Sequence, residues 1–464
     1  MFFSRIKTPG IAHVAYVIAE GGRAAIVDPR RDVDEYLDVL KANDLTLMYV
    51  LETHRQEDFE LGSAALKTIT GAKIVSGDHL LFAHSDIRLK DGEELELGGL
   101  TFKALHTPGH TPESVSYAVY IKSYPGKAWG VFTGDALFIG DAGRTDLPGA
   151  DKTAENASLL FDSIRNKILP LGDQAFLLPA HGAGTVCGGN VADWDHATLG
   201  LEKTSNPALT LERDEFIRHR LRDRIPRPPY FTLMEEVNLK GGRPLKLRFR
   251  DVPVFQPEDF KNAAKDGIII DTRLPEAFAG GHIPGSYSIW LKGVAMFGGW
   301  IADTRTRVYL VVDAPSTLEQ ATLFLARQGI DHLAGVLAGG FEAWRNAGMP
   351  VEQSGTIAAK ELAESRDAYA VLDVREISEF EAGHIEGATN LYVGYLEDRL
   401  ADLPQAFGKS SRIAVTCSVG HRASLAVSIL KRHGYEDVHN LLGGMTAWRQ
   451  LDLPTVREIE QHAA

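Results

Sequence analysis

Apolar residues in the first half of the chain form short runs that alternate with segments of helical periodicity. The runs at residues 24–27 and 47–51 consist of consecutive apolar side chains, as expected for buried strands. Between them, the segment 32–42 repeats its apolar residues at intervals of three and four, which is typical of a helix packed on one face. This alternation predicts a layered α/β architecture.

Ionisable residues gather where the predicted strands end. The strand at 129–133 leads through a glycine to Asp135, and the strand at 176–178 leads to His181 two residues after its proline. Loops at strand ends often carry functional groups on a rigid scaffold. We therefore predict a site that is assembled from several loops.

A first domain boundary is predicted near residue 245. Residues 218–229 are rich in arginine and proline, and the glycine pair at 241–242 precedes a new pattern of strands. The first domain is therefore expected to span residues 1–245.

Beyond this boundary the chain repeats itself. The repeated elements are Asp-x-Arg, Gly-His-Ile and a closing Gly-Gly, at 271–273, 281–283 and 339–340 in the first copy and at 373–375, 383–385 and 443–444 in the second. The first two elements have the same spacing in both copies. Because each copy has the length of a whole domain, we predict two related domains at 246–353 and 354–464.

Charge and hydropathy exclude several classes of partner. The 49 lysines and arginines are outnumbered by 62 aspartates and glutamates, and the resulting net charge of −13 repels nucleic acid. The hydrophobic content of 44% is sufficient for several cores, yet no run reaches the roughly 18 apolar residues of a membrane-spanning helix. We expect neither nucleic acid nor a membrane as a partner.

The two cysteines, Cys187 and Cys417, are far apart in the sequence. They provide no disulfide framework, so a reducing compartment is expected, and the cytoplasm is the predicted location.

Four short motifs of the first domain carry ionisable residues in a fixed order. They are Thr-His-Arg-Gln-Glu-Asp-Phe at 53–59, Thr-Pro-Gly-His at 107–110, Thr-Gly-Asp at 133–135 and Pro-Ala-His at 179–181. Together they resemble the metallo-β-lactamase superfamily over roughly residues 10–240. The resemblance implies an αββα sandwich for this domain.

The first motif departs from the family pattern, because Gln56 and Phe59 stand where the family usually has histidines. A two-zinc hydrolase would lose a ligand at each metal. The remaining His54, His110 and Asp135 form the set of two imidazoles and one carboxylate that holds mononuclear Fe(II) and leaves positions open for substrate and O₂. This set resembles the persulfide dioxygenase branch, which implies one Fe(II) per chain, although zinc or another divalent metal also binds such ligands.

The same resemblance assigns roles to residues around the site. It implies that Arg144 helps to hold the thiol carrier of a persulfide, and that Asp58 and His181 support the metal by hydrogen bonds, with direct ligation as the alternative. Cys187 follows His181 in a glycine-rich stretch. It either holds or relays sulfur, or it is a small buried apolar residue.

A cysteine loop follows the strand predicted at 413–416 in the last domain. Its residues are Cys417, Ser418, Val419, Gly420, His421 and Arg422, and helical character follows at 423–432. Loop amides, a helix N-terminus and a guanidinium stabilise a thiolate and then a persulfide. With the repeated Asp-x-Arg and Gly-His-Ile elements, the segment 354–455 resembles the rhodanese family, which implies α/β domains with mainly parallel sheets and a catalytic role for Cys417 and Arg422. A phosphatase also uses such a loop, but the repeated elements have no role in that alternative.

The middle domain lacks these catalytic groups. Its strand at 308–312 leads to the segment 313–318, which contains neither cysteine nor arginine, and Asp313 is predicted to occupy the cysteine position. Because a carboxylate cannot carry sulfane sulfur, this domain is predicted to be catalytically silent. It either positions the outer domains or forms contacts between copies of the chain in a homo-oligomer.

Together the resemblances imply sulfide detoxification. A persulfide of glutathione or another small thiol would react with O₂ to give sulfite and the free thiol, and Cys417 would pass sulfane sulfur to sulfite, which gives thiosulfate. Two alternatives remain. One is a zinc-dependent thioester hydrolase of the glyoxalase II kind, fused to a sulfurtransferase. The other is a non-enzymatic sulfur carrier that binds no metal.

Overall fold

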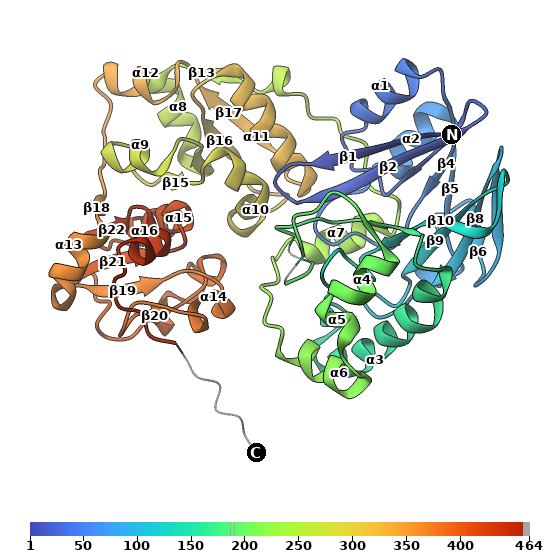
Figure 1. The fold of residues 1–464 in the computed structure, drawn as a ribbon. Coiled ribbons are helices and arrows are strands. Elements are labelled where there is room, and N and C mark those ends of the chain that lie inside the picture. Colours follow the sequence, from blue (N-terminus) through green and yellow to red (C-terminus); the bar gives the residue numbers. More distant parts are fainter. Residues whose placement is uncertain (186, 190, 458–464) are drawn as a thin grey trace. The chain divides into compact units, whose positions relative to one another are not determined.

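The computed structural model of the protein describes residues 1–185, 187–189 and 191–457 (Figure 1). The end of the predicted last domain, 458–464, lies outside these residues. The chain divides into two compact units. One comprises Met1–Lys246 with Arg327–Gly329, and the other comprises Leu247–Ala326 and the residues from Ile330 onward. None of the described helices combines the length and the apolar character that a membrane span requires.

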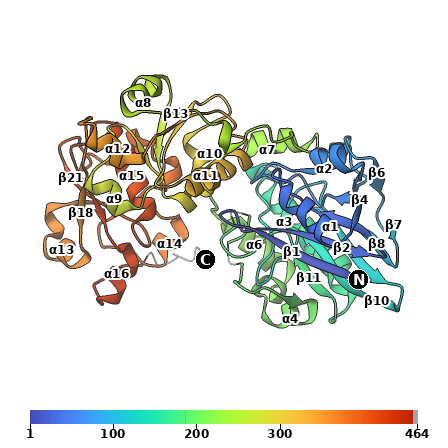
Figure 2. The ribbon, with the colours of Figure 1, turned by 90° about the horizontal axis from the view of Figure 1, so that it is seen from above.

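Two mixed sheets form the centre of the first unit. In spatial order, the first sheet contains β1 (Phe2–Thr8), β2 (His13–Glu20), β3 (Arg23–Val27), β4 (Thr46–Leu51), β5 (Lys73–Gly77) and β6 (Ile87–Leu89). The second contains β12 (Ala197–Thr198), β11 (Phe176–Pro179), β10 (Tyr124–Gly134), β9 (Val115–Ile121), β8 (Leu100–His106) and β7 (Glu94–Leu97). The strand β1 lies at the edge of its sheet, beside β2 (Figure 2).

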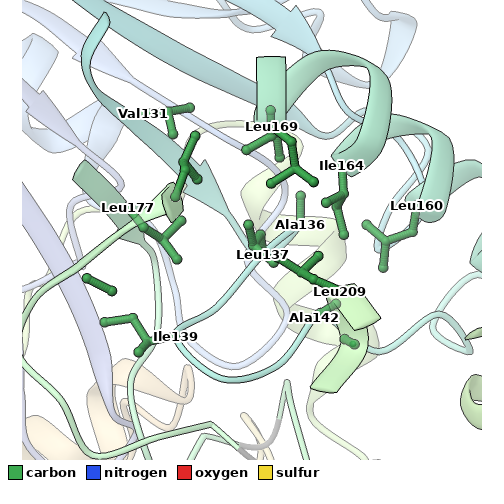
Figure 3. Close-up of a cluster of buried hydrophobic side chains, with 14 of the residues drawn as sticks. Val131, Ala136, Leu137, Ile139, Ala142, Leu160, Ile164, Leu169, Leu177 and Leu209 are labelled. Carbon is green, nitrogen blue, oxygen red and sulfur yellow. The ribbon is translucent and has the colours of Figure 1, made fainter. Parts of the chain in front are cut away.

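Helices cover the outer faces of these sheets. The helices of the unit are α1 (Asp34–Ala42), α2 (Ser63–Thr70), α3 (Thr153–Ser163), α4 (Leu199–Ser205), α5 (Pro207–Thr210), α6 (Arg213–Arg222) and α7 (Phe231–Asn238). Helices α1 and α2 contribute Tyr36 and Leu66 to a core with β2 and β3. Helix α3 contributes Leu160 to a second core with β10 and β11 (Figure 3).

The alternation of side chains along a strand explains the layers. In β2, Tyr16 and its alternate neighbours enter the core between the sheets, whereas Val17 enters the core beneath α1 and α2. In β10, Phe132 faces the other sheet and Val131 faces α3. Both strands are therefore buried on two sides. The predicted αββα sandwich is confirmed.

The second unit contains two sheets of the same strand order. The first is β13 (Val254–Phe255), β17 (Leu333–Leu337), β16 (Val308–Val311), β14 (Ile268–Asp271) and β15 (Tyr287–Ser288). The second is β18 (Gly355–Ile357), β22 (Asp437–Leu441), β21 (Arg412–Thr416), β19 (Ala370–Asp373) and β20 (Thr389–Asn390). All of these neighbours pair in parallel. Two α/β domains with parallel sheets were predicted, and this is confirmed.

Helices connect the parallel strands of both sheets. Those of the first domain are α8 (Pro257–Ala263), α9 (Pro275–Gly280), α10 (Leu291–Ile301), α11 (Pro315–Arg327) and α12 (Gly340–Asn346). Those of the second are α13 (Ala359–Glu364), α14 (Ile377–Glu381), α15 (His421–Arg432) and α16 (Gly444–Gln450). Such crossovers bring functional loops to the carboxyl ends of the strands.

The repeated sequence elements hold this fold together. In the last domain, the buried Arg375 pairs with Asp373 and donates to the carbonyl of Gly383 at 2.9 Å. The next residue, His384, stacks on Phe380 with ring centroids 3.6 Å apart. The first copy has the same contacts, with Arg273, Asp271, His282 and Phe278. The Asp-x-Arg and Gly-His-Ile elements therefore have a structural role in both domains.

Candidate functional site

Loops at the ends of four strands meet in the first unit. His54 follows β4, His110 follows β8, Asp135 follows β10 and His181 follows β11. All four side chains are buried. The prediction that several loops build one site therefore matches the positions of these residues.

The structure brings the three predicted metal ligands together. Asp135 Oδ2 lies 3.7 Å from His54 Nε2 and 3.6 Å from His110 Nε2. The two imidazole rings are nearly perpendicular, with centroids 5.1 Å apart. Distances of this size leave space for one ion between the three side chains.

Glu57 is a fourth member of this cluster, and the sequence reasoning missed it. Its Oε1 lies 2.9 Å from His110 Nε2, and its Oε2 lies 3.8 Å from His54 Nε2. One ligand atom from each of His54, Glu57, His110 and Asp135 lies within 4.8 Å of the others. An acidic residue beside Gln56, which replaces a histidine, was the available signal in the sequence.

Hydrogen bonds aim both histidines at the cluster. The Thr53 hydroxyl donates to Asp28, and its oxygen lies 2.9 Å from His54 Nδ1. His110 Nδ1 lies 2.9 Å from the carbonyl of Arg144, which can only accept. Both rings therefore direct Nε2 toward the cluster, and the carbonyl of Arg144 requires the proton of His110 on Nδ1, as in metal-binding histidines.

The electrostatics of the cluster fit a bound cation. Burial acts against the charged forms, but the histidine–carboxylate contacts outweigh it, which lowers the pKa of Glu57 to about 2 and raises that of His110 to about 9. His54 Nε2, Glu57 Oε2 and Asp135 Oδ2 are buried without a hydrogen-bond partner among the described residues. Buried polar atoms normally have partners. Two nitrogens and two carboxylates suit iron, zinc and other divalent transition metals.

The two replaced histidine positions have different surroundings. The Gln56 side-chain amide contacts His54 Nδ1 at 3.3 Å, on the side of the ring that faces away from the cluster. Phe59 packs against His13 with centroids 4.1 Å apart. A benzyl side chain offers no ligand atom, so one histidine of the usual second metal site is replaced by an apolar contact.

Asp58 and His181 extend the cluster on the far side of Asp135. His181 Nδ1 lies 2.8 Å from Asp135 Oδ1, and His181 Nε2 lies 2.9 Å from Asp58 Oδ2. Burial opposes the charge, but the two carboxylates outweigh it and raise the pKa of His181. An imidazole with both nitrogens on carboxylates orients Asp135, which agrees with a supporting role. That role stays a prediction, since Asp58, His181 and Cys187 also offer a second set of ligand atoms within 4.8 Å.

Cys187 reaches this site. Its Sγ donates to Glu57 Oε1 at 3.3 Å, and its side chain is buried. Burial and the nearby carboxylates of Glu57 and Asp58 raise the pKa of the thiol. A role in sulfur transfer stays a prediction.

The Arg144 side chain is also buried. Its guanidinium pairs with Asp146 and donates to the carbonyls of Ile225 and Pro226 at 2.9 and 3.1 Å. These contacts stabilise the loop that carries the Arg144 carbonyl, which orients His110. Its predicted role in recognition of the thiol carrier stays a prediction.

The cysteine loop of the last domain connects β21 with α15. Cys417 is almost fully buried, and its Sγ accepts from the backbone N–H of Gly420 at 3.1 Å. Gly420 has φ +102°, a conformation that favours glycine. A Cβ on Gly444 would lie 2.2 Å from the Cys417 carbonyl oxygen, so the closing glycine pair lets α16 approach the loop. Cys417 thus lies beside a loop amide and the start of α15, and its role in a persulfide cradle stays a prediction.

A network of hydrogen bonds holds Arg422. Its guanidinium makes two bonds to Glu379, at 2.6 and 2.8 Å, and another at 2.8 Å to the Ser418 hydroxyl. The guanidinium outweighs the effect of burial and lowers the pKa of Glu379. Glu379, in α14, is a second residue that the sequence reasoning missed. Glu379 holds the Arg422 guanidinium against the cysteine loop.

Sheet register corrects one prediction for the middle domain. Asp271 pairs with Val311, and Asp373 pairs with Thr416, so Val312 is the counterpart of Cys417. The predicted counterpart, Asp313, is wrong by one residue. The connection before α11 comprises residues 312–314, whereas 417–420 precede α15. The middle domain therefore lacks both the nucleophile and one residue of the loop.

Comparisons with known proteins agree with the two kinds of domain that carry these sites. The family model of the metallo-beta-lactamase superfamily matches residues 8–181, and that of the rhodanese-like domain matches 256–347 and 358–451. A metallo-beta-lactamase structure from Staphylococcus aureus is 28% identical, covers 73% of this chain and 98% of its own, and has a TM-score of 0.65.

Two curated relatives differ in their activities. Hydroxyacylglutathione hydrolase GloC of Haemophilus influenzae is 33% identical over 207 residues, which covers 40% of this chain and 87% of the relative. Persulfide dioxygenase ETHE1 of Homo sapiens is 28% identical over 225 residues, which covers 48% of this chain and 81% of the relative. The chain belongs to the metallo-β-lactamase superfamily and carries two rhodanese-like domains behind that domain.

Proposed function

We propose that the protein oxidises a low-molecular-weight persulfide with O₂ at one Fe(II) ion and then transfers sulfane sulfur to sulfite. The observation that carries this proposal is the buried cluster of His54, Glu57, His110 and Asp135, in a chain that also holds Cys417 in a persulfide cradle. Similarity to a relative that is named a persulfide dioxygenase supports it.

The buried side chains of the cluster would hold the metal and exclude water from its surroundings. Fe(II), when bound, would supply the redox chemistry that activates O₂. His54, His110 and Asp135 would bind the ion, and Glu57 would provide a further oxygen. His181 orients Asp135. In the overall reaction RSSH, O₂ and H₂O give RSH, sulfite and two protons, so the terminal sulfur is oxidised and O₂ is reduced.

Sulfur transfer would take place on the last domain. The Cys417 thiolate attacks the terminal sulfur of a second persulfide, which releases RSH and leaves a Cys417 persulfide. Sulfite then attacks its outer sulfur, which forms thiosulfate and restores the thiolate. The Gly420 amide and Arg422 stabilise the anionic sulfur in both steps. The proposed substrates are therefore a persulfide of glutathione or another thiol, O₂ and sulfite.

Thioester hydrolysis is the second candidate, because GloC, a relative named as a hydrolase, is 33% identical. A zinc ion would then activate water for attack on a glutathione thioester. Phe59 disfavours this candidate, because it removes one nitrogen ligand from the second metal position.

O₂ uptake separates these functions. The full chain, loaded with iron under anaerobic conditions, receives glutathione persulfide, and O₂, sulfite and thiosulfate are quantified. We expect O₂ uptake with thiosulfate as the main product. Hydrolysis of a glutathione thioester by the zinc-loaded chain, without O₂ uptake by the iron-loaded chain, would replace the proposal with a hydrolase. If the purified chain binds no metal, the result would favour the non-enzymatic sulfur carrier.

Cys187→Ser tests the sulfur relay. We expect the rate of O₂ uptake to fall by about tenfold at unchanged metal content, because a serine hydroxyl keeps the hydrogen bond to Glu57 but cannot carry or relay sulfur. Cys187→Ala, which also removes the hydrogen bond, is measured beside it to separate sulfur chemistry from hydrogen bonding. Unchanged rates and products in Cys187→Ser would leave Cys187 as a small buried side chain.

A further inference from the structure

Helix α10 of the middle domain lies beside the cysteine loop of the last domain. Trp290, directly before the helix, stacks on His421 with ring centroids 4.8 Å apart and an interplanar angle of 20°. His421 belongs to the loop and is the first residue of α15. An aromatic side chain of the silent domain thus contacts the catalytic loop.

The other end of α10 makes a second aromatic contact. Trp300 packs edge-on against Tyr395 and Tyr392, with centroids 5.1 and 5.7 Å apart. A Cβ on Gly394 would lie 2.7 Å from the Trp300 ring, so glycine permits this approach. Both ends of α10 are therefore fixed against the last domain.

Buried hydrogen bonds fix α15 in the same position. The strand β15 lies next to α15 (Figure 1). The Ser288 amide donates to Ser428 Oγ at 3.0 Å, and the Ser288 hydroxyl lies 2.7 Å from Ser424 Oγ. All three serines are buried. Satisfied polar groups of this kind define one arrangement of two surfaces, so the helix that begins with His421 has a defined position on the middle domain.

The side chains of the cysteine loop differ in their burial and in their partners. Cys417 is buried, and Arg422 is bound to Glu379 and Ser418. Val419 is 48% exposed, and His421 is partly buried beneath Trp290. Burial lowers the pKa of His421, against the effect of the Glu276 carboxylate, so the ring is neutral near pH 7 and has one N–H to donate.

We propose that Trp290 is a positioning residue for sulfur transfer: by stacking on His421, it holds the imidazole beside the cysteine loop, where the ring binds the anionic sulfur donor or acceptor. The ligand class is a small sulfur oxyanion, such as thiosulfate or sulfite. The inference rests on the proposed sulfurtransferase activity of Cys417. It gives the silent domain a part in the reaction.

A double-mutant cycle on the full chain tests this role. Thiosulfate is the sulfur donor and cyanide is the acceptor, so that Cys417 takes the outer sulfur, sulfite leaves, and thiocyanate forms. We expect Trp290→Ala to lower kcat/KM for thiosulfate about 5- to 10-fold, mainly through a higher KM, and Trp290→Phe to restore most of it. The double variant Trp290→Ala/His421→Ala should be no worse than His421→Ala alone, because Trp290 acts through His421.

Several outcomes would overturn the inference. Trp194→Ala, which removes an exposed tryptophan of the first unit, is the matched control and should leave kcat/KM unchanged. Full activity in Trp290→Ala, or independent losses that multiply in the double variant, would overturn the role of Trp290 alone. If Trp290→Ala unfolds, His421→Ala decides, since wild-type kinetics in that variant would equally overturn it. Transfer that is absent from the wild type, or that persists in Cys417→Ser, would overturn the proposed sulfurtransferase itself.

Discussion

Replacing Cys417 with serine is expected to end thiosulfate formation while O₂ uptake continues and sulfite accumulates. A serine oxygen fits the same cradle, where Gly420 donates its amide hydrogen, but it cannot carry sulfane sulfur as a persulfide. We expect the rate of thiosulfate formation to fall by at least about 1,000-fold. Sulfite and thiosulfate are quantified together with O₂ after addition of glutathione persulfide.

The sequence provides the matched control for this variant. It contains two cysteines, so Cys417→Ser leaves Cys187 as the remaining thiol, and Cys187→Ser leaves Cys417. Mass spectrometry of each variant after persulfide treatment locates the bound sulfur. Thiosulfate formed at the wild-type rate by Cys417→Ser would contradict the assignment of Cys417, and a persulfide on Cys187 would then identify the alternative carrier.

Replacing His110 with alanine is expected to remove the metal and, with it, O₂ uptake. The His110 imidazole is held by the Arg144 carbonyl and lies between Glu57 and Asp135. Alanine removes this nitrogen ligand and leaves the two buried carboxylates without their histidine contact. We expect metal affinity to fall by at least about 100-fold. Metal content by atomic spectroscopy and O₂ uptake are measured on the same samples, and transfer from thiosulfate to cyanide should persist.

His106→Ala is the control for this loss. His106 lies in β8, a few residues before His110, and its Nε2 contacts the carbonyl of Leu89 outside the cluster. One metal per chain is expected in this variant and in the wild type. Glu57→Gln should lose metal less strongly than His110→Ala, because two histidines and Asp135 remain. A His110→Ala chain that keeps its metal would contradict the predicted ligand set.

The metal cluster could be predicted in large part from local sequence. His54, His110 and Asp135 each follow a strand, and strand ends of a layered α/β fold converge. Glu57 could not be predicted in this way, because its contact with His110 depends on how the loop after β4 turns. Spacing along the chain does not define that turn. Glu379, the partner of Arg422, is 43 residues away in the sequence, so only the structure shows that the two side chains meet.

The position of Val312 was missed for a different reason. Hydrogen bonding between β14 and β16 sets the register, whereas counting from distant motifs adds up every insertion in between. The contact of Trp290 with His421 was also beyond sequence reasoning. It requires the packing of one domain against another, which no single repeat encodes.

The shorter connection before α11 restricts how sulfur transfer could be introduced into the middle domain. Residues 312–314 stand in place of a four-residue turn, so a cysteine introduced at Val312 would lie in a connection that is one residue shorter than the cysteine loop requires. An insertion would have to accompany several substitutions. Substitutions alone therefore do not build a cysteine loop in the middle domain, and its contact with the last domain through Trp290 is the contribution that this domain can make.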